Sequence, residues 1–122
     1  MVTAVTNLGR SGVYDWLVQR ITAVVLAAYT FFIVGFILSH PQLDYAEWQA
    51  LFSHFWVRIF SLLALVSMAA HAWIGLWVVL TDYVTTQTMG RKGPAIRLGL
   101  QIVLGVVTVA YTVWGIEILW GF

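Results

Sequence analysis

The sequence predicts an all-α integral membrane protein with three transmembrane helices, and composition and hydropathy both favour this class. Of the 122 residues, 61% are hydrophobic and only 9% are charged, with a mean hydropathy of +0.90. A soluble domain carries roughly a quarter charged residues and a lower apolar fraction. Three apolar stretches each reach the ~20 residues that a helix needs to cross a bilayer. Together they occupy nearly the whole chain, which leaves no segment for a separate water-soluble core.

The same composition excludes several classes of function. There is no cysteine, so neither a disulfide nor a thiolate-bound cluster can form within this chain. The net charge of +1 gives no indication of nucleic-acid binding. We find no glycine-rich phosphate loop, no serine–histidine–aspartate set and no internal repeat. Any iron–sulfur chemistry would therefore lie in a partner protein.

The expected elements follow in order along the chain. They are a polar arm (1–15), a first transmembrane helix (16–38), a loop (39–54), a second transmembrane helix (55–83), a polar connection (84–94) and a third transmembrane helix (95–120). Asp15 is a candidate N-cap for the first helix, and Pro41 breaks that helix after its end. Asp44 and Glu47 have capping-box spacing, which predicts a short helix at the interface within the loop.

The N-terminal stretch is predicted to be retained, because Arg10, Asp15 and Arg20 stand where a signal peptide would have its apolar core. The second helix is long enough to span with tilt. The polar connection contains two glycines, a proline and the adjacent Arg91 and Lys92. The third helix ends in Trp-Gly-Phe, which is typical of an interfacial aromatic anchor.

The cations predict the orientation. All but Arg58 flank the start of the first helix or the connection between the second and third helices: Arg10, Arg20, Arg91, Lys92 and Arg97. The positive-inside rule places these two segments in the cytoplasm. Three spans then put the C-terminus on the opposite side of the membrane.

His71 is the most informative residue, because an ionisable side chain at membrane depth is costly and is usually functional. Imidazole is a common axial ligand of haem iron. Small residues share its helix face (Ala64, Ser67 and Gly75), which would leave room for a flat macrocycle. A histidine that bonds to a neighbouring helix, with Gly75 as a close packing contact, fits the pattern equally well. These two interpretations remain open.

A haem held by two histidines needs a second ligand. His40 and His54 lie near the outer interface, so neither is well placed to provide it. If His71 binds haem in this way, the second ligand comes from another subunit.

Asp82 and Tyr83 end the second helix, where it meets the cytoplasmic headgroups. Eleven residues turn a helix by roughly 1100°, so Asp82 lies within about 20° of the face of His71 and about 16 Å along the axis. Tyr83 is offset by about 120° from that face. An aromatic-belt tyrosine and a solvated aspartate explain the pair. A quinone pocket is the alternative, because a phenol can donate to a quinone carbonyl while a carboxylate positions the phenol or relays protons.

Arg20 lies on the same membrane side, and it too has two interpretations. It is either a snorkelling anchor at the membrane surface or a partner for a haem propionate, which suits the guanidinium fork.

Three segments carry a resemblance to a known family: LGRSGVYDWLVQRITAVVL near the N-terminus, HAWIGLW around His71, and TDYV around Asp82 and Tyr83. The chain resembles the hydrophobic membrane-anchor subunits of bacterial succinate dehydrogenase, respiratory complex II. The resemblance runs over nearly the whole chain, and the spacing from His71 to the Asp-Tyr pair is its most specific part. After TDYV the chain departs from the family pattern, with a longer connection, TTQTMGRKGPAIRL, in place of a short lysine-proline turn.

The resemblance implies a non-catalytic anchor within an oxidoreductase complex of the respiratory chain and the tricarboxylic acid cycle. It implies that His71 is one axial ligand of haem b iron and that Arg20 lies near the propionates. It implies that Tyr83 hydrogen-bonds ubiquinone, with Asp82 close by. The partners would be a cytochrome b subunit that supplies the other ligand and completes the helical bundle, an iron–sulfur subunit, and a flavoprotein that carries FAD.

The implied location is the bacterial inner membrane, with the N-terminus in the cytoplasm and the C-terminus and the 39–54 loop in the periplasm. The implied assembly is a heterotetramer in membrane lipid, and its association into trimers is left open. Three alternatives remain: the anchor of a quinol:fumarate reductase, a haem-free structural scaffold, and a small transporter subunit. The transporter is ranked last, because it would need several deep polar groups and only His71 lies deep.

Overall fold

The computed structural model describes residues 12–121, and its regular elements there are all helices. They are α1 (Gly12–Ser39), α2 (Tyr45–Ser53), α3 (Phe55–Tyr83), α4 (Thr86–Met89), the 3₁₀ turn η1 (Gly90–Lys92) and α5 (Gly93–Trp120). Among these residues, three helical segments are long and apolar enough to cross a membrane: α1, α3, and the run 86–120 that contains α5. The predicted class, an all-α membrane protein, is confirmed.

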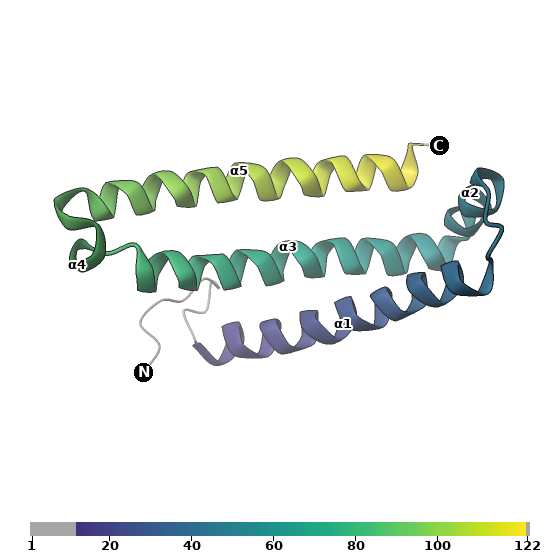
Figure 1. Ribbon diagram of the computed structural model, residues 1–122, viewed down its shortest axis with the longest axis horizontal. Helices are drawn as coiled ribbons and strands as arrows, with labels where there is room; N and C mark the ends of the chain where they lie inside the picture. The colour runs from purple at the N-terminus through teal and green to yellow at the C-terminus, as the bar shows by residue number, and fades with distance from the viewer. Residues whose placement is uncertain (1–11, 122) are drawn as a thin grey trace.

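The three long helices lie side by side with α3 in the middle (Figure 1). α3 packs against α1 on one side and α5 on the other. The start of α1, the end of α3 and the start of α5 lie at one end of the molecule, and α2 lies at the other. Within residues 12–121 the buried hydrophobic side chains are few: Ala64, Ile74, Val84 and Leu119. Side chains such as Phe31 (79% exposed) therefore face outward, as lipid or a partner helix requires.

The first helix begins at Gly12, earlier than the predicted start at residue 16, so Asp15 is not its N-cap. Asp15 instead lies in the first helical turn and is buried, at 7% exposure. An acidic residue in the first turn complements the positive end of the helix dipole, which explains the misleading sequence signal. Residues 1–11 of the predicted arm, including Arg10, lie outside the described residues.

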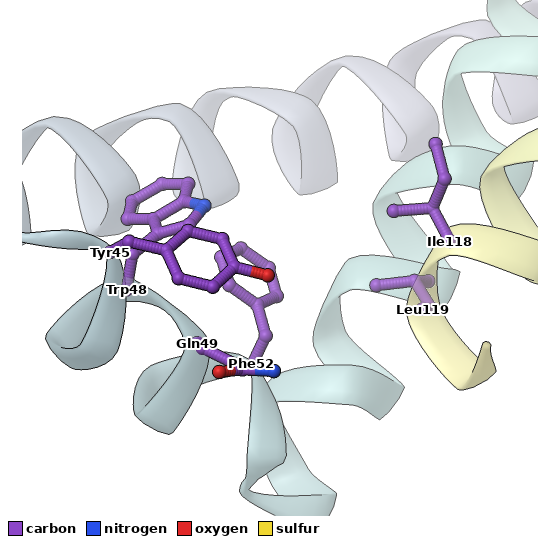
Figure 2. Close-up of a pocket in the computed structure, with 6 residues that line it drawn as sticks. All are labelled: Tyr45, Trp48, Gln49, Phe52, Ile118 and Leu119. Atoms are coloured by element: carbon purple, nitrogen blue, oxygen red, sulfur yellow. The ribbon is translucent and has the colours of Figure 1, made fainter. Parts of the chain in front are cut away.

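The predicted short helix within the loop is confirmed as α2. Its capping box is present: Glu47 N–H donates to Asp44 Oδ1 at 2.8 Å, and Asp44 N–H donates to Glu47 Oε2 at 3.3 Å. Trp48 and Phe52 pack edge to face on this helix, with ring centroids 4.9 Å apart. Figure 2 shows aromatic side chains of α2 on one side of a cavity of about 330 Å³, across from Ile118 and Leu119 of α5. The cavity thus lies between α2 and the end of α5.

The connection predicted at 84–94 is folded rather than extended. Thr85 caps α4 by accepting from the N–H of Thr88. Gly90 has φ +73°, a left-handed conformation that favours glycine. Gly93 has no room for a Cβ, which would lie 2.5 Å from the Thr85 carbonyl oxygen. α5 accordingly begins at Gly93, two residues before the predicted start, with Pro94 in its first turn.

Candidate functional site

His71 lies near the middle of α3, and its ring is directed at α1. Its Nδ1 is 3.1 Å from Oγ1 of Thr22, which is buried at 6% exposure. The imidazole itself is half-buried. A hydrogen bond between side chains 49 positions apart therefore links the two helices at this level.

The surroundings of Thr22 determine which nitrogen of His71 carries the proton. Oγ1 of Thr22 also lies 2.7 Å from the carbonyl oxygen of Val18 and 3.2 Å from that of Gln19. A carbonyl can only accept, so the single hydroxyl proton of Thr22 is directed at Val18. Thr22 Oγ1 must then accept from His71 Nδ1–H. In neutral imidazole this leaves the lone pair on Nε2.

Nε2 of His71 forms no hydrogen bond within residues 12–121. A histidine with Nδ1–H bonded to a protein oxygen and a free Nε2 has the arrangement of a metal-ligating imidazole. The described part of the chain holds no group of three or more metal-ligating side chains. His71 can therefore contribute one ligand to a metal whose other ligands come from elsewhere.

The small residues on the face of His71 are buried or in close contact with a neighbouring helix. Ala64 and Ser67 are each 5% exposed. A Cβ on Gly75 would lie 3.3 Å from Nε2 of Gln19, so glycine lets the Gln19 amide rest on the α3 backbone. Both features of the packing interpretation are therefore present, the bond from His71 to α1 and the close contact at Gly75. The expectation that Ala64 and Ser67 leave room for a macrocycle is wrong, because both side chains are buried. This packing leaves Nε2 of His71 without a hydrogen bond in the described residues.

A cavity of about 310 Å³ opens between α1 and α3, one turn beyond His71. Its lining includes Gln19 and Arg20 from α1 and Ile74, Gly75 and Val78 from α3. Oε1 of Gln19 is enclosed there and has no hydrogen-bond partner in the part of the chain described. The cavity thus combines an unpaired amide oxygen with a cationic side chain.

Arg20 lies well inside α1 rather than at its start. It follows Gly12 by eight residues, or about 12 Å of helix. Because Thr22 faces His71 and Gln19 faces Gly75, Arg20 stands at about the same depth as His71. Its guanidinium lies 5.6 Å from the centre of the Trp16 ring, and among residues 12–121 it forms no ion pair with a carboxylate.

Asp82 and Tyr83 form a separate group at the end of α3. Both side chains are exposed, Tyr83 at 68%. The Tyr83 carbonyl accepts from the Thr88 hydroxyl, which ties the end of α3 to α4. The structure therefore brings His71 and Arg20 to one level and leaves Asp82 and Tyr83 at the end of α3.

Thr22 and Gln19 were missed by sequence reasoning. A threonine or glutamine within an apolar helix is a weak signal, because either can bond to its own helix or to a neighbour. Thr22 could have been identified only if the alignment of the first two transmembrane helices, which sets Thr22 opposite His71, had been known. That alignment depends on tertiary packing.

Comparisons with known proteins agree with the resemblance described above. The family described as Succinate dehydrogenase/Fumarate reductase transmembrane subunit matches residues 3–113. The succinate dehydrogenase hydrophobic membrane anchor subunit of Coxiella burnetii is 43% identical over 116 residues, which cover 95% of each chain. The subunits of the same name from Rickettsia bellii and Rickettsia typhi are each 29% identical, over 82 and 79 residues. These alignments cover 66% and 65% of this chain and 64% and 63% of the two relatives.

Proposed function

The chain belongs to the succinate dehydrogenase/fumarate reductase transmembrane subunit family, as a succinate dehydrogenase membrane anchor, and from this premise we propose that it supplies one ligand of a haem b and part of a ubiquinone site. Succinate oxidation would take place in the flavoprotein and iron–sulfur subunits. The chain would hold those subunits at the membrane and would be no enzyme by itself. The complex would be a heterotetramer completed by a cytochrome b subunit.

The single observation that carries the haem proposal is the state of His71. Thr22 occupies Nδ1, and Nε2 keeps its lone pair without a partner in the described residues. When bound, haem b supplies a one-electron redox centre. The residues of this chain would hold one side of it: His71 through Nε2, and Arg20 at the same depth through its guanidinium. Arg20 suits a propionate because its charge has no carboxylate partner within residues 12–121.

The proposed quinone contact is the hydroxyl of Tyr83. A ubiquinone holds its tail in the bilayer, so its head can reach a side chain at the membrane edge. Tyr83 is exposed there, and its phenol can donate a hydrogen bond to a quinone carbonyl. Asp82 precedes it in the sequence, at the same end of α3, where its carboxylate can relay protons toward the quinone.

The charges of the described residues support a topology with the start of α1 in the cytoplasm. Arg91, Lys92 and Arg97 belong to η1 and the start of α5, at that end of the molecule. Arg58 belongs to the first turn of α3, at the opposite end, where Asp44 and Glu47 of the α2 capping box and Glu117 near the end of α5 also lie. We accordingly place the chain in the bacterial inner membrane, with the C-terminus in the periplasm. The positive end then faces the side where the flavoprotein and iron–sulfur subunits would dock.

The test is a reduced-minus-oxidised optical spectrum of the complex, purified through a tag on this chain. We expect a b-type signal in the wild type that His71→Leu abolishes or shifts while the partner subunits stay bound. An unchanged spectrum would place both haem ligands outside this chain. Absence of haem from both samples would leave the structural scaffold as the better description.

A fumarate reductase anchor is the second candidate, because the matching family includes both enzymes. The two differ in the direction of electron flow, which the partners and the quinone pool set. Comparing succinate oxidation with quinol-driven fumarate reduction by the purified complex would distinguish them.

A further inference from the structure

We propose that Thr22 is a positioning residue for His71, which fixes the tautomer and orientation of the imidazole and strengthens it as an iron ligand. This inference rests on the proposed haem ligation and goes beyond it by naming the residue on α1 that controls the ligand. It concerns a hydrogen bond to the nitrogen that does not face the metal.

The geometry forms a relay of two hydrogen bonds. His71 Nδ1–H donates to Thr22 Oγ1 at 3.1 Å, and the Thr22 hydroxyl donates to the Val18 carbonyl at 2.7 Å. Because the second bond fixes the direction of the hydroxyl proton, Thr22 can act toward His71 only as an acceptor. Bonds in such a chain polarise one another, most strongly in a site of low dielectric constant. Thr22 is buried, at 6% exposure, so water does not compete with its hydroxyl oxygen for the Nδ1–H of His71.

Two other threonines show what Thr22 does beyond satisfying its own hydroxyl. Thr30 on α1 donates to the Leu26 carbonyl at 2.8 Å, and Thr112 on α5 donates to the Thr108 carbonyl at 2.7 Å. Each bonds four residues back, as threonines commonly do in apolar helices. Neither forms a bond to another helix among the described residues. The bond from His71 is thus what separates Thr22 from them.

Such a bond has a defined electronic effect. An acceptor at Nδ1–H raises the basicity of a metal-ligating imidazole and holds its ring plane. A more basic ligand favours the ferric over the ferrous form and so lowers the midpoint potential. Loss of a comparable outer partner weakens metal binding by about 10- to 100-fold.

The experiment uses the complete complex and three variants: Thr22→Val, Thr22→Ser and Thr30→Val. The readouts are haem content, the midpoint potential from redox titration, and the paramagnetic resonance spectrum of the ferric haem, which reports ring orientation. We expect Thr22→Val to raise the midpoint potential, change the resonance spectrum and release haem more readily. Thr22→Ser should keep the wild-type haem content, midpoint potential and resonance spectrum, because it keeps the hydroxyl. Thr30→Val should match the wild type, since its lost bond lies on the same helix without a link to His71.

An unchanged potential and resonance spectrum in Thr22→Val would overturn this inference while His71→Leu still showed that His71 is a ligand. A Thr22→Ser variant as altered as Thr22→Val, with assembly lost in proportion, would also overturn it by assigning Thr22 to helix packing alone. A His71→Leu complex with the wild-type spectrum would instead refute the haem ligation on which the inference rests. The two failures are therefore distinguishable.

Discussion

The two nitrogen atoms of His71 have different surroundings, and that difference supports the proposed ligand role over a role in packing alone. Nδ1 is bonded to Thr22, and Nε2 has no partner in the described chain. A histidine retained only for helix packing would gain from using both nitrogens, because an unpaired polar atom in an apolar environment is costly. One bonded and one unbonded nitrogen therefore fits the proposal that a group from outside this chain binds Nε2.

Tyr83 lies about 18 Å along α3 from His71, twelve residues at about 1.5 Å each. The two residues share no described hydrogen bond or ring contact. The structure therefore predicts that the haem and quinone functions are separable by substitution.

Tyr83→Phe should lower quinone reduction and leave the haem spectrum unchanged. The change removes one hydroxyl from an exposed side chain, so folding should be unaffected. A single hydrogen bond contributes about 0.5–1.5 kcal/mol, which corresponds to about a 2- to 12-fold lower kcat/KM for quinone. Steady-state reduction of a short-tailed ubiquinone by succinate measures this.

The control for Tyr83→Phe is succinate oxidation with a soluble electron acceptor, which bypasses the membrane subunits and should stay at the wild-type rate. Full activity with ubiquinone would show that the phenol hydroxyl forms no important contact with the quinone.

At the scale of the helices, α3 packs at glycine against both neighbours, and the described side-chain hydrogen bonds between long helices join it to α1. Hydrogen bonds link it to α1: His71 to Thr22, and Ser61 to Tyr29 at 2.7 Å. Close packing at glycine links it to α5. A Cβ on Gly115 would lie 2.7 and 2.9 Å from the two methyl groups of Leu65. Small residues and interhelical hydrogen bonds are the two general means of helix association in lipid.

Gly115→Ala should weaken the contact between α3 and α5. Overpacking costs about 1–3 kcal/mol, and the higher helix propensity of alanine returns about 1 kcal/mol, so we expect a net loss of up to about 2 kcal/mol. A lower Tm of the purified complex in detergent would report it.

Gly105→Ala is the matched control on the same helix. Its Cβ would lie 3.6 Å from the Trp73 ring, an ordinary contact, so the Tm should stay level or rise. Equal effects of the two substitutions would contradict the proposed role of Gly115.

The sequence predicted those helices and helix ends that depend on nearby residues alone. Apolar length predicted the three spans, and Asp44 with Glu47 predicted the start of α2. It misplaced the start of α1, because Asp15 suits the first turn of a helix as well as its cap. The folded connection before α5 was missed because it depends on the close approach of Gly93 to Thr85.

For the site, the sequence identified the ionisable residue but not its partner. A histidine at membrane depth is rare enough to be recognised alone. The pairing with Thr22 and the depth of Arg20 both depend on how α1 and α3 are aligned, which no local pattern encodes. Candidate ligands could thus be predicted, but the tautomer of His71 could not.

For the whole molecule, the arrangement of α1 and α5 on opposite sides of α3 produces a layer with two broad faces (Figure 1). Such a layer has little interior, and several of its few buried side chains, such as Thr22 and Ser61, lie at the contact between α1 and α3. His71 is half-buried at one of these contacts, so it remains accessible to a group held between this chain and another.

This arrangement predicts that the chain alone cannot complete a haem site. His40 and His54 lie at the α2 end of the molecule, far from the middle of α3, so neither can act as the second ligand. Expressed without the cytochrome b subunit, the chain should accumulate poorly and show no six-coordinate b-type spectrum. Expression with that subunit should restore both the protein level and the spectrum. A six-coordinate spectrum with two histidine ligands from the chain alone would mean that two of its own histidines meet, or that two copies pair through His71. His40→Leu and His54→Leu would separate these cases, because pairing through His71 would survive both substitutions.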